Sequence, residues 1–449
     1  MANDILVKVG ADITNFSRAM ASANRDLQQF SNANQQTFDA FKQTGAIVTG
    51  AGIALATGLG FAVTEAIKFE DSFAGVRKTV DASEAEFAAL EQGFRDLSKE
   101  IPASIHEINA VGEAAGQLGI EKENILEFTR TMIDLGVATN MSSDEAATAL
   151  ARLANITGMP QTEFDRLGAT IVDLGNNLAT TESEIVEMGL RLAGAGAQVG
   201  MTEAQIMSFA GALSSVGIEA EAGGSAFSKV MINMQLAAER GGKDLENFAK
   251  VAGMSADEFK QAYEQDAAGA MMTFIEGLST VEDRGMSAIG VLDEMGITEV
   301  RMRDALLRAA GASDVFTEAL EIGTNAWEEN TALSDEAAER YKTVMSQLKI
   351  LGNTIRDVAI SFGDALMPAI KLVIGWLQKL SDWFSGLSET TKSTIAIFTA
   401  VAAAIMLIVG PILLVIGFIP AILSGLTAIA TVFGTTVAVL LKVVAIGAG

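Results

Sequence analysis

The longest feature in the hydrophobic pattern is a run between Lys392 and Lys442 that contains no charged residue. It is roughly twice the ~20 apolar residues that a helix needs to cross a bilayer. The rest of the chain is mostly polar and rich in helix-forming residues. The pattern therefore predicts a water-soluble body joined to a C-terminal segment, residues 392–449, that is competent to enter a membrane.

Proline and glycine residues interrupt this apolar segment near its middle. We expect a helical hairpin, with helices near residues 395–417 and 421–441 and a tight turn at Pro420. The alternative is one longer helix that bends at Pro411.

A second uncharged stretch covers residues 43–64. Gly52, Ala56, Gly60 and Thr64 recur every four residues in it, which is the small-residue stripe that lets helix backbones approach closely in lipid. The same stripe suits an Ala/Gly-rich helix that is buried between neighbours in a protein assembly. Both interpretations predict one apolar helix.

Two rows of apolar residues alternate steps of four and three, which places each row along one side of a helix, as in a coiled-coil seam. The first row lies in residues 1–42, after a short alternating run at residues 5–9 that is typical of a strand, and consists of Phe16, Met20, Ala23, Leu27, Phe30, Asn34 and Phe41. It indicates either a self-associating coil or an amphipathic helix packed on its own domain.

The second row lies in residues 341–391 and predicts one long amphipathic helix over 344–387, with a kink at Pro368. Its members are Val344, Leu348, Leu351, Ile355, Val358, Phe362, Ala365, Ala369, Leu372 and Trp376. Trp376, Trp383 and Phe384 then precede the apolar tail. They suit either an interfacial aromatic belt beside lysines or an ordinary core.

Residues 65–340 form a polar segment with a recurring junction, in which a helix-ending glycine and an apolar residue precede Ser or Thr. The junctions are Gly200-Met201-Thr202, Gly253-Met254-Ser255 and Gly296-Ile297-Thr298. Capping boxes are expected for the pairs Ser142 with Glu145, Thr181 with Glu184, Thr202 with Gln205, and Ser255 with Glu258. These signals predict a compact domain of short helices joined by tight turns.

Composition agrees with helix and narrows the function. The 449 residues include only five Pro and two Tyr, and 56 acidic against 31 basic side chains give a formal net charge of −25. This charge argues against sequence-specific binding of nucleic acid, which needs clustered Lys and Arg. The first twelve residues lack the basic and apolar regions of a secretory signal.

No catalytic constellation is found in the sequence. The chain has no cysteine, and its single histidine, His106, has no second histidine for a zinc pair and is expected to face solvent on a helix. Acidic pairs follow helix N-caps, where the helix dipole explains them. We expect no enzyme, and no catalytic, cofactor-binding or metal-binding residues.

The predicted fold class is therefore all-α. It comprises an N-terminal coiled-coil-like helix, an apolar helix, a central domain of short capped helices, a long amphipathic helix and a C-terminal apolar hairpin.

Several short runs of the polar segment resemble the core region of phage and prophage tail tape measure proteins. They are residues 66–80 (AIKFEDSFAGVRKTV), 97–102 (LSKEIP), 117–120 (QLGI), 128–129 (FT) and 222–227 (AGGSAF), the last being similar to a small-residue turn before a helix. The resemblance covers residues 65–340. Its motifs are helix-packing signatures, so no site residue can be transferred.

The resemblance implies an oligomeric helical rod, trimeric or hexameric, that lies in the lumen of the virion tail tube and sets tail length during assembly. It also implies release at infection to help DNA through the host inner membrane, and tail tube, tail chaperone and distal tail proteins as partners. The chain is short for this role, because 449 residues in one helix would reach ~670 Å. We expect a short tail or further C-terminal sequence.

Two other function classes remain open. One is a pore-forming protein or toxin whose helical hairpin is sheltered by a soluble body. The other is an integral-membrane receptor with an N-terminal sensing domain.

Overall fold

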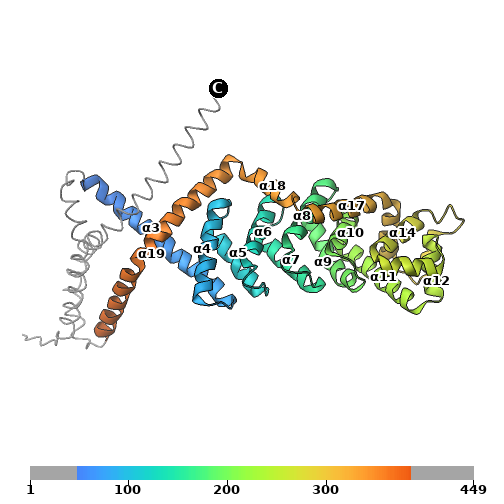
Figure 1. Ribbon diagram of the computed structural model, residues 1–449, viewed down its shortest axis with the longest axis horizontal. Coiled ribbons are helices and arrows are strands. Elements are labelled where there is room, and N and C mark those ends of the chain that lie inside the picture. The colour runs from blue at the N-terminus through green and yellow to red at the C-terminus, as the bar shows by residue number, and fades with distance from the viewer. Residues whose placement is uncertain (1–47, 386–449) are drawn as a thin grey trace, which may run out of the picture. The chain divides into compact units, whose positions relative to one another are not determined.

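The structure is a computed structural model that describes residues 48–385 (Figure 1). Within that range it contains 17 helices and no strand, which confirms the all-α expectation. The chain divides into two compact units. We call residues 71–353 the body. The described part of the other unit, residues 48–70 and 354–385, is called the helix pair.

The helices of the first half are α3 (Val48–Thr79), α4 (Glu84–Glu100), α5 (Ile105–Gln117), α6 (Ile125–Ala138), α7 (Ser143–Thr157), α8 (Phe164–Asn177), α9 (Glu182–Gln198), α10 (Glu203–Ser215) and α11 (Ala220–Arg240). Those of the second half are α12 (Lys243–Ala252), α13 (Ala256–Gln265), α14 (Ala267–Ser279), α15 (Ala288–Glu294), α16 (Val300–Gly311), α17 (Ser313–Glu329), α18 (Ala332–Tyr341) and α19 (Val344–Ser385).

The helix boundaries of the body follow the local signals in the sequence. All four expected capping boxes are present, at the starts of α7, α9, α10 and α13. Gly200, Gly253 and Gly296 all have positive φ, which glycine adopts without the strain of a Cβ. The residue after Gly200 donates its N–H to the Gly196 carbonyl and buries its side chain against the helix it leaves.

One junction differs from the prediction. Thr298 does not cap a helix, because α16 begins one residue later than expected, with Glu299 at its N-cap. The position three residues after Thr298 is Arg301, which offers no acceptor for the reciprocal bond of a capping box.

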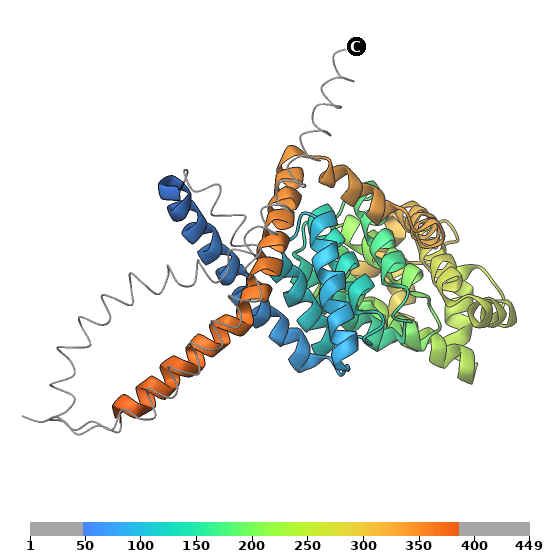
Figure 2. The ribbon, with the colours of Figure 1, turned by 60° about the vertical axis from the view of Figure 1, so that its left-hand side comes forward.

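The body runs out and back along its own length. From α4 to α14, neighbours in sequence are mostly neighbours in space, and the chain then returns over helices it has already formed. We call α16–α18 the return arm: α16 packs on α11 and α14, α17 on α10 and α8, and α18 on α8 and α6. Figure 1 shows α17 and α18 lying beside α8 and α10, and the turned view keeps them there (Figure 2).

The return arm is held by the hydrophobic core. Phe316 of α17 is 1% exposed, and its ring contacts Phe209 edge-on and stacks on Phe227, with centroids 5.7 and 6.2 Å away. Gly323, about two turns later, lies against the buried Ser208 of α10. The arm therefore completes the core of the body.

We expect Gly323→Leu to destabilise the body by about 3 kcal/mol through overpacking. A Cβ at this position would overlap Ser208 Oγ, which is fixed by a 2.7 Å bond to the Ala204 carbonyl. Urea unfolding of both variants would measure the loss. Gly311→Leu, also in the return arm, is the matched control, because no atom lies within 4 Å of its Cβ position. Equal stability of the two variants would contradict this packing.

Polar contacts fasten the end of the return arm. Arg166 donates to the Trp327 carbonyl at 2.6 Å, and Asn330 donates to Asp165 at 2.5 Å. Tyr341 donates to Asp134, whose pKa is raised by burial. These bonds join residues far apart in the sequence, so they fix where the arm ends on the body.

The start of α19 is also fixed to the body. The Asn353 side chain is buried and donates to the carbonyls of Ser98 and Ala103, at 3.0 and 2.6 Å. Because these carbonyls are buried and the Asn353 amide satisfies them, the first turns of α19 are held against the end of α4 and the α4–α5 turn.

The expected turn at residues 222–227 is wrong, because these residues lie inside α11. Gly224 allows α11 to approach α9 closely, because a Cβ there would overlap Arg191 of α9. A Cβ at Gly223 would overlap Ile218, in the connection before α11, and crowd Met188 of α9. The small residues serve helix packing and do not form a turn.

In the helix pair, α3 and α19 approach each other through small residues. Gly363 of α19 lies against Ala62 and Ala66 of α3, where a Cβ would overlap both. Gly60 and Thr64, two residues of the predicted small-residue stripe, are exposed and do not make this contact. Helix α3 also continues through the expected boundary at 64/65.

The long amphipathic helix is confirmed as α19, which begins at Val344 and continues through Pro368 to Ser385. The N-terminal row at 16–41, the run at 5–9 and the apolar hairpin at 395–441 lie outside the described residues.

Candidate functional surfaces

The 4,3 row of α19 is largely not used for packing within the chain. Ile355, Leu372 and Trp376 are 44%, 64% and 40% exposed. The residues of α19 that are buried in the helix pair lie on other sides of the helix and include Ala359, Gly363 and Leu366. The sequence predicted the row correctly, and the structure leaves it open.

Two basic side chains of α19 lie against acidic side chains of α3. Lys371 pairs with Glu70 at 2.8 Å, and Arg356 lies 3.7 Å from the buried carboxylate of Glu65. A partly buried carboxylate retains its charge at low cost only beside a cation. Both cations lie off the row, whose own residues carry no charge.

Within the described residues, one helical segment, Val344–Trp376, is long and apolar enough to cross a membrane. Length and composition alone support this, and 28% of its most apolar window is buried. The helix therefore gives only weak support for a membrane role.

The net negative charge of the chain lies in the body. Acidic and basic side chains cancel over the rest of the chain, so residues 71–353 carry the whole formal charge of −25. Two bodies brought together would repel each other, and so would a body and a nucleic-acid backbone.

The single histidine is half-buried, whereas the sequence suggested a solvent-facing residue. His106 Nδ1 lies 3.2 Å from Ser72 Oγ, and the buried Asn109 donates to the same hydroxyl at 2.8 Å. The two side chains of α5 thus join α5 to the part of α3 that belongs to the body. Neither hollow described below includes these residues.

We expect His106→Ala to cost about 1 kcal/mol of stability through the lost bond to Ser72, and to leave the helical content unchanged. Thermal unfolding and circular dichroism would measure the two effects. Unchanged stability would contradict a structural role for this bond.

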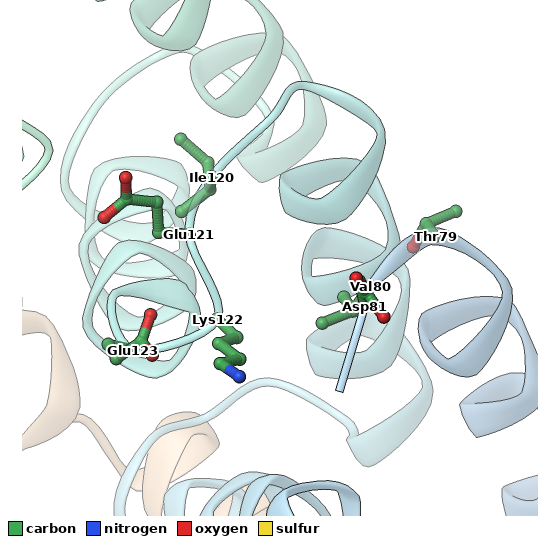
Figure 3. A pocket seen from close by; sticks show the side chains of 7 residues that line it. All are labelled: Thr79, Val80, Asp81, Ile120, Glu121, Lys122 and Glu123. Carbon is green, nitrogen blue, oxygen red and sulfur yellow. The ribbon is translucent and has the colours of Figure 1, made fainter. Parts of the chain in front are cut away.

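The body has a hollow of about 340 Å³ between the C-terminal end of α3 and the α5–α6 turn. Figure 3 shows Thr79, Val80 and Asp81 on one side and residues 120–123 on the other. Lys122 pairs with Glu86 at 2.8 Å and, with bonds from Ser83, lowers the pKa of Glu86 to about 2. The lining is mostly charged, unlike the apolar lining of small-molecule sites.

A second hollow of about 370 Å³ lies beside Gly277 and Arg284. The guanidinium of Arg284 donates to the carbonyls of Val251 and Gly277, at 2.6 and 2.5 Å. It therefore caps the ends of α12 and α14, where a cation is favoured by the helix dipole. In the part of the chain that the structure describes, no group of three or more acidic or histidine side chains could hold a metal ion.

Comparison with known proteins gives one match. Residues 91–295, within the body, match the family model of phage-related minor tail proteins. No curated protein and no solved structure matched the chain. The family match supports a phage tail protein.

Proposed function

We propose that the chain is a tail tape measure protein, a helical rod in the lumen of the phage tail tube that sets tail length during assembly. The observation that carries this proposal is the match of residues 91–295 to phage-related minor tail proteins, flanked by long apolar and amphipathic segments in the order typical of tape measure proteins. Helix α19, with 42 residues, would alone contribute ~63 Å of length.

The proposed role is structural and not enzymatic. We propose that the chain forms a homo-oligomer, a trimer or hexamer, and contacts the tail tube, tail chaperone and distal tail proteins. The acidic body suits a lumen that DNA must pass, because it does not attract the DNA backbone. On infection the chain would leave the tube and place its apolar tail in the host inner membrane, without reading a nucleic-acid sequence.

A pore-forming protein with a soluble helical body is the second candidate. The apolar length of the Val344–Trp376 segment favours it, as does the uncharged run before Lys442. The two proposals differ in location, because a pore-forming toxin has no reason to reside inside a virion.

The proposal is tested on purified particles that carry an epitope on the chain. In intact virions the chain should be protected from added protease, and it should become sensitive after DNA ejection is triggered. An accessible tail-surface protein serves as the control for protease activity. Absence of the chain from virions would favour the pore-forming protein instead.

A further inference from the structure

The helix pair exposes more large apolar side chains than its size explains. Phe61 and Ile67 of α3 are 43% and 46% exposed, and α19 adds Ile355 and residues 372–374 and 376. On the much larger body, exposed apolar residues away from the start of α19 occur singly, as on most soluble proteins. An apolar surface of this density indicates a binding partner.

The exposed row has the form of a coiled-coil seam between like helices. With Leu348 at an a position, the row fills a and d positions from 344 to 376. None of the flanking e and g positions in that stretch is charged. Two copies could therefore pair in register without placing like charges opposite each other.

The distribution of charge selects which parts of two copies can meet. Bodies of charge −25 repel, whereas the remainder of the chain is balanced and its row is apolar. Helix α19 joins the body at its N-terminal end and leads to the uncharged stretch before Lys442 at the other. Parallel pairing brings the uncharged tails together, where each can cover the apolar surface of the other, although it also brings the acidic bodies to the same end, where they repel each other. Antiparallel pairing separates the bodies but sets each apolar tail beside an acidic body.

We infer that the apolar row of α19 is a seam at which copies of this chain pair in parallel and in register. The occupant of the surface is a second copy of the chain, and α3 lies outside the seam on the charged side of α19. This inference rests on the proposed homo-oligomer and identifies where its copies meet.

Salt should strengthen this association. The seam is apolar, so screening removes no attraction from it, whereas the repulsion between the acidic bodies is screened. The screening length falls from about 30 Å at 0.01 M to about 10 Å at 0.1 M salt. An interface built on ion pairs would weaken under the same change.

The chain has no cysteine, so single cysteines can report the seam in the full-length protein. Ile355→Cys and Leu372→Cys place a thiol on the row, and Asp364→Cys places one at an exposed position off the row. Each variant would be purified in detergent, oxidised mildly at low and high salt, and separated on a non-reducing gel. Circular dichroism would check that all three are equally helical.

The two row variants should shift from 46.9 kDa to twice that mass, with more dimer at high salt, and the Asp364→Cys variant should stay monomeric. A pair of copies would be trapped even from a trimer or hexamer. If all variants stay monomeric, the inference is overturned, and the row is covered by the chain's own tail or by a lipid surface instead. Equal crosslinking of Asp364→Cys would overturn it as well, since collision would explain the dimers. Neither result bears on protease protection inside the virion, which tests the proposed function separately.

Discussion

Replacing Leu413 and Ile422 by arginine is expected to abolish liposome permeabilisation by the full-length chain while the helical body stays folded. Both positions lie outside the described residues, and the expectation comes from the sequence. Two apolar helices satisfy their backbone groups internally, so a bilayer is a permitted environment for residues 395–441. Arginine at the centre of such a helix costs roughly 3 kcal/mol on insertion scales.

Dye release from liposomes measures the effect, and circular dichroism checks the body. The matched control places arginine at two exposed apolar positions of the body, Ile289 and Val300, which are 55% and 80% exposed. That control should permeabilise as the parent does. If the Leu413→Arg, Ile422→Arg chain also does so, the tail is a packing element between subunits and not a membrane segment.

The parts of the fold that the sequence predicted are those set by local chemistry. A Ser or Thr with Glu or Gln three residues later satisfies backbone groups within one turn, so its outcome does not depend on distant residues. The boxes at Ser142, Thr181, Thr202 and Ser255 formed for this reason. Three residues after Thr298 stands Arg301, which has no acceptor for a capping box, and α16 takes Glu299 as its N-cap instead.

The return arm could not be predicted, because its contacts depend on residues far away in the chain. Arg166 and Trp327 are separated by 161 positions, and no local pattern marks either as a partner of the other. The same limit explains Gly223 and Gly224. Adjacent glycines suit a turn and a close helix contact equally well, and only the position of α9 decides between them.

For the candidate surface, the sequence predicted the row of α19 but not what the chain would do with it. Periodicity shows that one side of a helix is apolar, and it is silent about which neighbour covers that side. The contact with α3 uses Gly363 and two alanines, a set of small residues that carries little hydrophobic signal. The predicted stripe on α3 stays a prediction, because Gly60 and Thr64 are exposed within the chain and the neighbour that would cover them is a membrane or another protein.

The second large effect concerns tail length. Duplicating residues 348–375 adds four heptad repeats and keeps both the seam and the contact with α3 in phase. If α19 lies along the tube as a helix, the tail should lengthen by ~42 Å, at about 1.5 Å per residue. Particle yield should be unchanged, because no surface of the body is altered.

The most direct test of the account is the distribution of tail lengths in electron micrographs of particles that carry this duplication. A polar insertion of the same length between Gly241 and Gly242, in the turn between α11 and α12, is the control, because it enlarges the body without lengthening α19. The account predicts a mean increase of ~42 Å for the duplication, and parental tails for the control. Tails of parental length in the duplicated variant, with the chain present in the particles, would contradict a role in setting length.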